Sequence, residues 1–398
     1  MPVDFDALPA RGAIPDGRQA VVPWLIAVVI IVAAGAATSS ATWPAGRPTQ
    51  TPWFWIRMFG LPLLVWLGLY FGWGFLGAHR LRNALADNAA IDRKEARLHG
   101  DASVPFAVMA QSWRFSGDAG QNRLEDAMKT RESTENPAGS GGLVIPGRAF
   151  FRGNEADELR RHAVVLEWLL VELIRPLMAP LKAAHGLTVW LCLDSDLTAD
   201  VAKTVITRAW ATLGLRYAEK VQLLEPMSLY SLDAWFDMGA RNARHLAIAV
   251  QLRGAISGGI QAGQAEAGAA VLLTGTSAES PDSGVPVRVH RPSRGTAGSL
   301  DEVVANALRW GHCAEGGIDT VWNPGLVEPL AAALRSLDGS VNEAPAVELV
   351  RTIGDAGVAT PWLALALAAA NAQESVSPQL ILDQQGGELV AMICRKKT

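Results

Sequence analysis

The sequence has few cysteines and no excess of charge of either sign. Its three cysteines, Cys192, Cys313 and Cys394, are widely spaced and form no Cys-x-x-Cys pair. An odd number of isolated cysteines argues against a disulfide framework, so we expect reduced thiols in a cytoplasmic domain. The net charge is −4 and the pI is about 6.0, which gives no global basic field that would attract nucleic acid.

Several motifs that carry chemistry are also missing. The chain has no Gly-x-Gly-x-x-Gly turn, no Walker loop, no Gly-x-Ser-x-Gly elbow and no His-Glu-x-x-His pair. We therefore expect no cofactor and no metal ion. These absences do not exclude catalysis by other means.

Two long runs near the N-terminus contain no charged residue, at positions 21–38 and 58–78. Each approaches the roughly 20 helical residues that cross a hydrocarbon core. The first run is not typical of a secretory signal, because a second span follows after about 20 residues. Trp24, Trp43 and Trp53 lie where interfacial aromatic residues are expected. A transmembrane hairpin is predicted, and the alternative is a buried helical pair in a soluble protein.

Lysine and arginine in the flanks of these runs set the expected orientation. Arg11 and Arg18 precede the first run, and a basic cluster that begins with Arg80 and Arg82 follows the second, whereas the connecting loop has few basic residues. The positive-inside rule then predicts an inner-membrane protein with two spans and both termini in the cytoplasm. The expected order is a cytoplasmic tail at 1–20, a hairpin at 21–78 and a polar stalk or linker at 79–142.

From 143 to 398 the pattern alternates between amphipathic or apolar helices and short apolar strands. This alternation predicts an α/β layer architecture on the cytoplasmic side of the membrane. The expected helices lie at 155–184 with a break at Pro176, 200–213, 232–242, 300–310, 326–337 and 359–372. The expected strands lie at 187–193, 221–224, 245–252, 269–273, 285–289, 318–322, 379–383 and 388–394, and the last two form a hairpin.

Three passages in the C-terminal half resemble the thiolase/ketoacyl-synthase fold, in the family's order. Residues 265–273 (AEAGAAVLL) are similar to a strand entry of that superfamily. Residues 318–325 (IDTVWNPG) stand where the family has a strand that ends in a catalytic loop. Residues 352–360 (TIGDAGVAT) resemble its glycine-rich turn before a helix of small residues. The resemblance implies a layered thiolase-like α/β domain.

The same resemblance implies a reacting cysteine at the start of a buried helix and two polar residues that bind the thioester oxygen. The region 232–242, where that cysteine is expected, contains none. Asn323 and Asp355 occupy the two polar positions, and an aspartate would repel a developing oxyanion. From these departures we expect a degenerate active site and a protein that is not an enzyme.

The overall plan also resembles, more distantly, the membrane-anchored adapters of lipase effectors in bacterial type VI secretion. This resemblance implies a non-catalytic adapter or chaperone whose partner is a protein such as a lipase effector or a secretion-tip protein. Thiolase-like folds further imply a homodimer. An alternative is a membrane-surface acyl-transfer enzyme that uses Cys192 or Cys313. A third possibility is a membrane scaffold that assembles through Gly68 and Gly72.

Three further groups of residues allow two interpretations each. Arg288, His290, Arg291 and Arg294 form a basic stretch that would contact either a partner or anionic lipid. The stretch 194–196 (DSD) is typical of a metal or phosphate loop, or of a helix N-cap. His312 beside Cys313 indicates either a nucleophile pair or a helix cap with a packed thiol.

Overall fold

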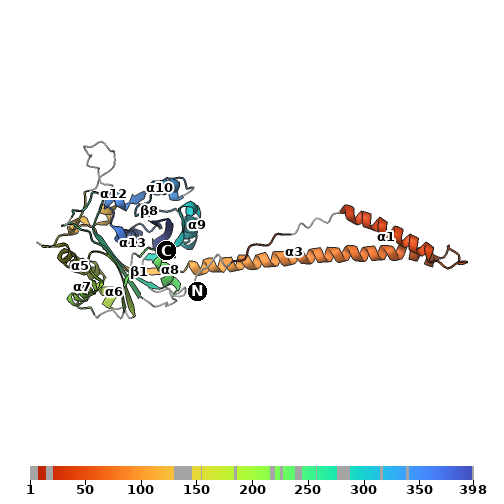
Figure 1. The fold of residues 1–398 in the computed structure, drawn as a ribbon, viewed down its shortest axis with the longest axis horizontal. Coiled ribbons are helices and arrows are strands. Elements are labelled where there is room, and N and C mark those ends of the chain that lie inside the picture. The colour runs from red at the N-terminus through yellow and green to blue at the C-terminus, as the bar shows by residue number, and fades with distance from the viewer. Residues whose placement is uncertain are drawn as a thin grey trace. The chain divides into compact units, whose positions relative to one another are not determined.

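The computed structural model describes residues 8–396 with internal gaps. Residues 1–7, 15–20, 130–145, 154, 183–185, 216–219, 225–226, 238–243, 257, 276–286, 314–316, 338–339 and 397–398 lie outside the described set. Contacts divide the chain into two compact units, one from Asp4 to Leu98 and the other from His99 to Thr398 together with the first three residues (Figure 1).

The N-terminal unit contains the two apolar runs as helices. It consists of α1 (Val21–Ala41), α2 (Pro52–Trp55), the π-helix η1 (Ile56–Gly60) and the first part of α3 (Leu61–Ala102). Two helical stretches, Val21–Ala41 and Pro52–Ala102, are long and apolar enough to cross a membrane. Large apolar side chains on both, such as Ile30 and Phe75, are more than 60% exposed. Such surfaces are unfavourable in water and suit a lipid environment.

One glycine determines how closely α1 and α3 approach. A Cβ atom added to Gly35 would lie 2.0 Å from Cγ of Pro62, so only glycine allows this contact. Nearby, the Trp66 indole N–H donates a hydrogen bond to the carbonyl of Trp24 at 3.1 Å. The two helices therefore pack as an antiparallel pair within this unit.

The α/β unit begins earlier than the sequence pattern indicates. The helix α3 continues to Ala102, and strand β1 (Phe106–Arg114) then enters the central sheet between β5 and β6. Residues 99–129 thus belong to the folded unit instead of a linker, while 130–142 lie outside the described residues. The strand escaped prediction because its polar residues Gln111 and Ser112 interrupt the apolar run.

An eleven-stranded mixed sheet forms the centre of this unit. Its order is β3-β2-β4-β5-β1-β6-β11-β10-β8-β9, with β7 paired to β11. Strands β2, β3 and β4 are mutually parallel, as are β10, β8 and β9. The remaining strands are β2 (Leu187–Asp194), β3 (Lys220–Leu224), β4 (Arg244–Gln251), β5 (Ala267–Gly275), β6 (Val287–Val289), β7 (Ser293–Thr296), β8 (Thr320–Asn323), β9 (Ala346–Glu348), β10 (Gln379–Gln385) and β11 (Glu388–Lys396).

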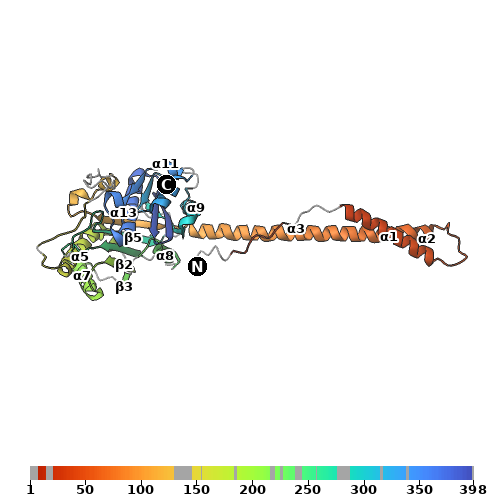
Figure 2. The same ribbon diagram turned by 45° about the horizontal axis from the view of Figure 1, so that its top comes forward.

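Helices cover the sheet on both sides (Figure 2). The longer ones are α5 (Glu158–Ile174), α7 (Ala199–Thr212), α9 (Leu300–Trp310), α10 (Glu328–Arg335) and α13 (Thr360–Ser375). Shorter ones are η2 (Ala119–Gln121), α4 (Leu124–Met128), η3 (Arg175–Leu177), α6 (Met178–Lys182), α8 (Ser231–Asp237), η4 (Ala297–Ser299), α11 (Ser340–Glu343), α12 (Leu349–Thr352) and η5 (Gly357–Ala359). The helices α5 and α7 pack against β2 and β4 in one apolar cluster, and α9 and α10 pack against β8 and β10 in another.

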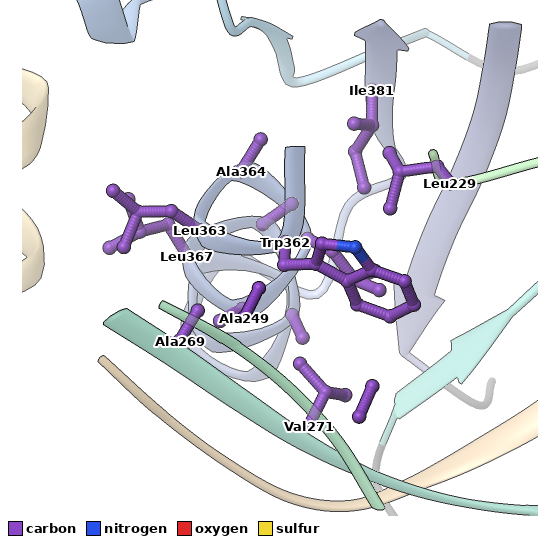
Figure 3. Close-up of a cluster of buried hydrophobic side chains, with 14 of the residues drawn as sticks. Leu229, Ala249, Ala269, Val271, Trp362, Leu363, Ala364, Leu367 and Ile381 are labelled. Carbon is purple, nitrogen blue, oxygen red and sulfur yellow. The ribbon is translucent and has the colours of Figure 1, made fainter. Parts of the chain in front are cut away.

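The helix α13 lies in the largest apolar cluster, between strands of both halves of the sheet (Figure 3). Every residue from Thr360 to Ala372 is buried. A helix that is apolar on all sides is stable only inside a core, which explains its alanine-rich and leucine-rich sequence. Trp362 also donates its indole N–H to the carbonyl of Met227 at 2.8 Å. Thus α13 anchors the segment that joins β3 to α8.

The α/β fold class and most of the expected elements are confirmed. The predicted break at Pro176 falls in η3, between α5 and α6. The strands β7 and β9 were not predicted, because their short sequences, SRGT and AVE, contain no run of apolar residues long enough to indicate a strand. The predicted helix at 232–242 corresponds to α8 up to Asp237, and its last residues lie outside the described set.

Candidate functional site

The carboxyl ends of the parallel strands β2 and β4 meet the loop that leads into α13. The side chain of Gln251 at the end of β4 donates to a carboxylate oxygen of Asp194 at 2.8 Å and accepts the N–H of Val358 at 3.1 Å. Ligands of open α/β sheets bind outside the carboxyl ends of the parallel strands. This edge is therefore the part of the fold where a reacting group is expected.

One thiol, that of Cys192, lies at this edge. Cys192 is in β2, two residues before its end, and is 1% exposed. The backbone N–H of Met227 donates to its sulfur at 3.3 Å. Burial raises the pKa of the Cys192 thiol, and the negative charge of Asp194 adds to this, while the Met227 N–H acts in the opposite direction. The thiol is therefore protonated at neutral pH in this state.

The other two cysteines lie elsewhere in the fold. Cys394 is fully buried in β11, and burial raises the pKa of its thiol far above the ordinary range. Cys313 follows α9 and donates its S–H to the carbonyl of Gly311 at 3.1 Å. Burial raises the pKa of the Cys313 thiol, opposed by Arg395. His312 adopts a left-handed backbone conformation with φ of 53°. The two side chains thus belong to a turn at the end of α9.

Asn323 and Asp355 both make local backbone contacts. The side-chain oxygen of Asn323, at the end of β8, accepts the N–H groups of Gly325 and Leu326 at 2.8 and 2.7 Å. Asp355 accepts the N–H of Gly357 at 2.9 Å, and its carboxylate lies 3.1 Å from the guanidinium of Arg253. Asn323 is buried and Asp355 is about half exposed. Their assignment as degenerate positions of the family's thioester-oxygen site stays a prediction.

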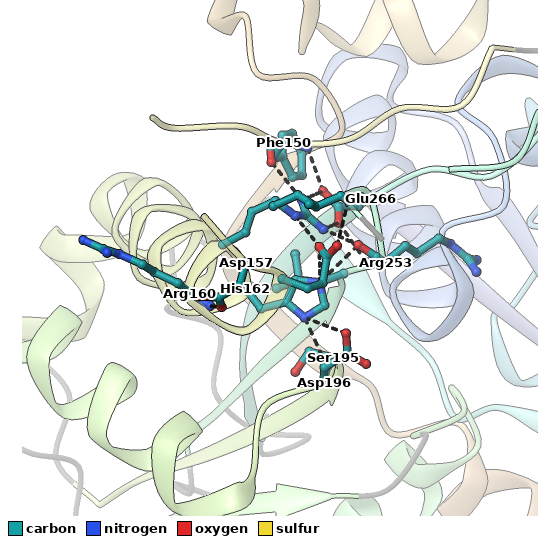
Figure 4. A network of polar contacts seen from close by, with 12 residues as sticks. Phe150, Asp157, Arg160, His162, Ser195, Asp196, Arg253 and Glu266 are labelled. Atoms are coloured by element: carbon teal, nitrogen blue, oxygen red, sulfur yellow. Dashed lines mark hydrogen bonds and ion pairs between the residues drawn. The ribbon is translucent and has the colours of Figure 1, made fainter. Parts of the chain in front are cut away.

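A buried ion-pair network surrounds Glu266 (Figure 4), and Arg253 of this network also pairs with Asp355. Both carboxylate oxygens of Glu266 accept from Arg161, at 2.7 and 3.0 Å, and they also accept the N–H groups of Arg253 and Phe150. Arg161 and Glu266 have no exposed side-chain surface. Burial lowers the pKa of the Arg161 guanidinium, but Glu266 and Glu158 outweigh this and raise it. The pair ties α5 to the start of β5.

The acidic turn after β2 is part of the same network. The N–H of Asp196 donates to Nδ1 of His162 at 3.1 Å, and Nε2 of His162 lies 3.1 Å from the carbonyl of Arg253 (Figure 4). The cap residue of α7 is Thr198, which makes no side-chain cap bond. Among the described residues, no cluster of histidine, cysteine and carboxylate side chains has the arrangement of a metal site. The turn thus positions His162, a role that sequence spacing did not indicate.

Two of the four residues of the basic stretch lie inside the protein, which removes them as contacts for lipid or a partner, while the assignment of Arg288 and Arg294 stays a prediction. His290 and Arg291 are each 3% exposed. Arg291 forms ion pairs with Asp233 and Asp237 of α8. Arg288 is partly buried in β6. Only Arg294 is about half exposed, and it pairs with Glu388 at 3.2 Å.

Comparisons with known proteins support the fold. No family model matches the chain, and no curated protein matches it. Among solved structures, a type III pentaketide synthase from Neurospora crassa is similar, with 13% identity and a TM-score of 0.50, over 73% of this chain and 100% of that one. A fungal type III polyketide synthase (12%, 0.46; 73% and 100%) and the acyltransferase ChlB3 (13%, 0.48; 74% and 98%) are also similar. The α/β unit therefore has a thiolase-like fold.

These findings correct two expectations. The similar structure with a TM-score of 0.50 is named as a pentaketide synthase and not as an adapter or chaperone. The expectation of a non-catalytic adapter, and of a protein that is not an enzyme, is thus wrong. No finding supports the resemblance to secretion adapters. The predicted protein partner and homodimer stay untested.

Proposed function

We propose that this protein is an acyl-transfer enzyme that works at a membrane surface, with Cys192 as the residue that accepts the acyl group. The observation that carries the proposal is the position of Cys192. It is the one cysteine of the three at the carboxyl edge of the parallel strands, in contact with the loop that leads to α8. The thiolase-like fold, shared with a synthase, supports the same reaction class.

The proposed reaction is a thioester exchange. The Cys192 sulfur attacks the acyl carbon, a new S–C bond forms, the bond from that carbon to the leaving thiol breaks, and the Cys192 proton passes to the leaving sulfur. The Met227 N–H, 3.3 Å from the sulfur, stabilises the thiolate form. Because Cys192 is 1% exposed, substrate entry requires displacement of the groups that cover its sulfur.

The membrane part of the proposal rests on the N-terminal unit. Its two apolar helices expose large apolar side chains over lengths that match a bilayer. With the positive-inside rule, they would anchor the chain in the inner membrane and keep the α/β unit in the cytoplasm. Such an anchor suits a substrate with a long acyl chain, which itself partitions into membranes.

Covalent trapping tests this function. The full chain in lipid nanodiscs is treated with a long-chain acyl chloromethyl ketone, and the modified peptide is identified by mass spectrometry. We expect modification at Cys192 that C192A abolishes and C313A leaves unchanged, with protection by an acyl thioester. Labelling only at Cys313, or no labelling of the folded protein, would overturn the assignment of Cys192.

A further inference from the structure

A cavity of about 500 Å³ opens beside the buried ion-pair network, in the α/β unit. Its exposed wall is more polar than apolar: Arg148, Glu266, Ser116 and Gln121 line it together with Phe150 and Ile260. Its volume is within the range of small-molecule sites in proteins. It is therefore large enough for an organic ligand of modest size.

The charge of Arg148 is not compensated in this cavity. Both terminal nitrogens of its guanidinium are buried, and neither has a hydrogen-bond partner in the described part of the chain. The other charged residue, Glu266, cannot serve as its partner, because both carboxylate oxygens are already occupied by Arg161 and by backbone N–H groups. A buried cation without a partner costs free energy, and an oxyanion would relieve that cost.

The backbone around Arg148 is held firmly in place. Its N–H donates to the carbonyl of Gln264 at 3.1 Å, and its carbonyl accepts the N–H of Glu266 at 2.9 Å. At Gly147, an added Cβ would lie 2.5 Å from the carbonyl oxygen of Ile260, so the close approach of these two segments requires glycine. The guanidinium is thus carried by a fixed segment of the cavity wall.

We infer that this cavity binds an organic anion of modest size, with a carboxylate or phosphate group on Arg148 and its remaining atoms against the mixed wall of Gln121 and Ile260. The planar guanidinium can hold either oxyanion through two parallel hydrogen bonds. A cavity of about 500 Å³ is far larger than a bare inorganic ion, so an organic group is expected to fill the remaining volume. The inference does not depend on the proposed acyl transfer, because none of the residues that carry it is Cys192 or its neighbour Met227.

Calorimetry with the full chain in nanodiscs tests the inference, with empty nanodiscs as the blank. The probes are benzoate, phenyl phosphate and the neutral analogue benzamide. We expect saturable binding of benzoate or phenyl phosphate, and the tighter of the two identifies the head group. Binding of neither anion, or equally tight binding of benzamide, would overturn the inference.

Two arginine variants complete the test. R148Q should weaken binding of the anion by about tenfold or more, because it removes a charge-assisted pair of hydrogen bonds. R152Q removes the same charge four residues away, from an exposed side chain that does not line the cavity, and should leave affinity unchanged. If R148Q does not fold, R148K, which keeps the charge and loses the planar fork, should weaken binding. Equal affinity in wild type and the Arg148 variants would contradict the inference.

Discussion

At the scale of single residues, two arginines in the same basic stretch lie in very different surroundings. Arg291 is 4% exposed and pairs with Asp233 and Asp237, whereas Arg294 is 47% exposed and pairs with Glu388. Spacing along the sequence could not distinguish them, because β7 begins between them and the chain passes from the interior to an edge.

Neutralising each arginine should separate these roles. R291Q leaves two partly buried carboxylates of α8 without their cation, and we expect it to lower the free energy of unfolding by about 3 kcal/mol. R294Q removes an exposed pair and should cost less than about 1 kcal/mol. Chemical denaturation of the full chain in detergent measures both. Equal losses in the two variants would refute the buried location of Arg291.

Ionisation of the buried Asp383 makes the free energy of unfolding depend on pH. It is 3% exposed, and burial raises its pKa to about 6. The folded state then holds its proton more tightly than the unfolded state, so the contribution of Asp383 to stability is complete below about pH 4 and is lost as pH rises through about 6. As pH rises from 4.5 to 7.5, we expect the free energy of unfolding of D383N to increase relative to that of wild type, by at most about 3 kcal/mol. A difference between the two proteins that does not change with pH would show that Asp383 ionises normally.

At the scale of elements, α13 depends on small side chains. Ala368 is fully buried in the largest apolar cluster. A leucine there must displace neighbouring side chains, and we expect A368L to lower the free energy of unfolding by about 1–3 kcal/mol. Ala211 in α7 is exposed, so A211L should have little effect. Chemical denaturation measures the free energy of unfolding of both variants. An A368L variant as stable as the wild type would mean that α13 is loosely packed.

The pairing of α1 with α3 depends on Gly35. G35L should separate the helices, since even a Cβ there would overlap Pro62. G72L should not, because nothing lies within 4 Å of a Cβ at Gly72. Cysteines placed at Trp24 and Trp66, which are joined by a hydrogen bond, report the pairing through the yield of oxidative crosslinking. A high yield in the G35L background would contradict the close approach.

At the scale of the whole molecule, apolar periodicity accounts for the two apolar helices, for most of the strands and for α13. These elements have long, uninterrupted apolar runs. The pattern missed β1, where the polar Ser112 interrupts the apolar run and its hydroxyl donates to the carbonyl of Leu173 through a tertiary contact. It also missed the pairing of Arg161 with Glu266, which are 105 positions apart. Neither contact has a local signal in the sequence.

The function was misjudged for a related reason. Asn323 and Asp355 were compared with a motif, position by position, and the absence of cysteine from 232–242 was taken to exclude catalysis. The folded chain brings Cys192, from an earlier strand, into contact with Met227 just before α8. A thiol can thus reach the edge of the sheet from a different element than the family motif predicts.

The central claim is that the membrane-anchored chain transfers acyl groups through Cys192. The most direct measurement is the release of free thiol from a long-chain acyl thioester by the full chain in nanodiscs, compared with C192S. For the wild type we expect an initial burst of about one thiol per protein, accompanied by an acyl adduct on the Cys192 peptide. For C192S we expect no burst and no adduct. Thiol release that is absent from the wild type, or that is the same in C192S, would contradict it.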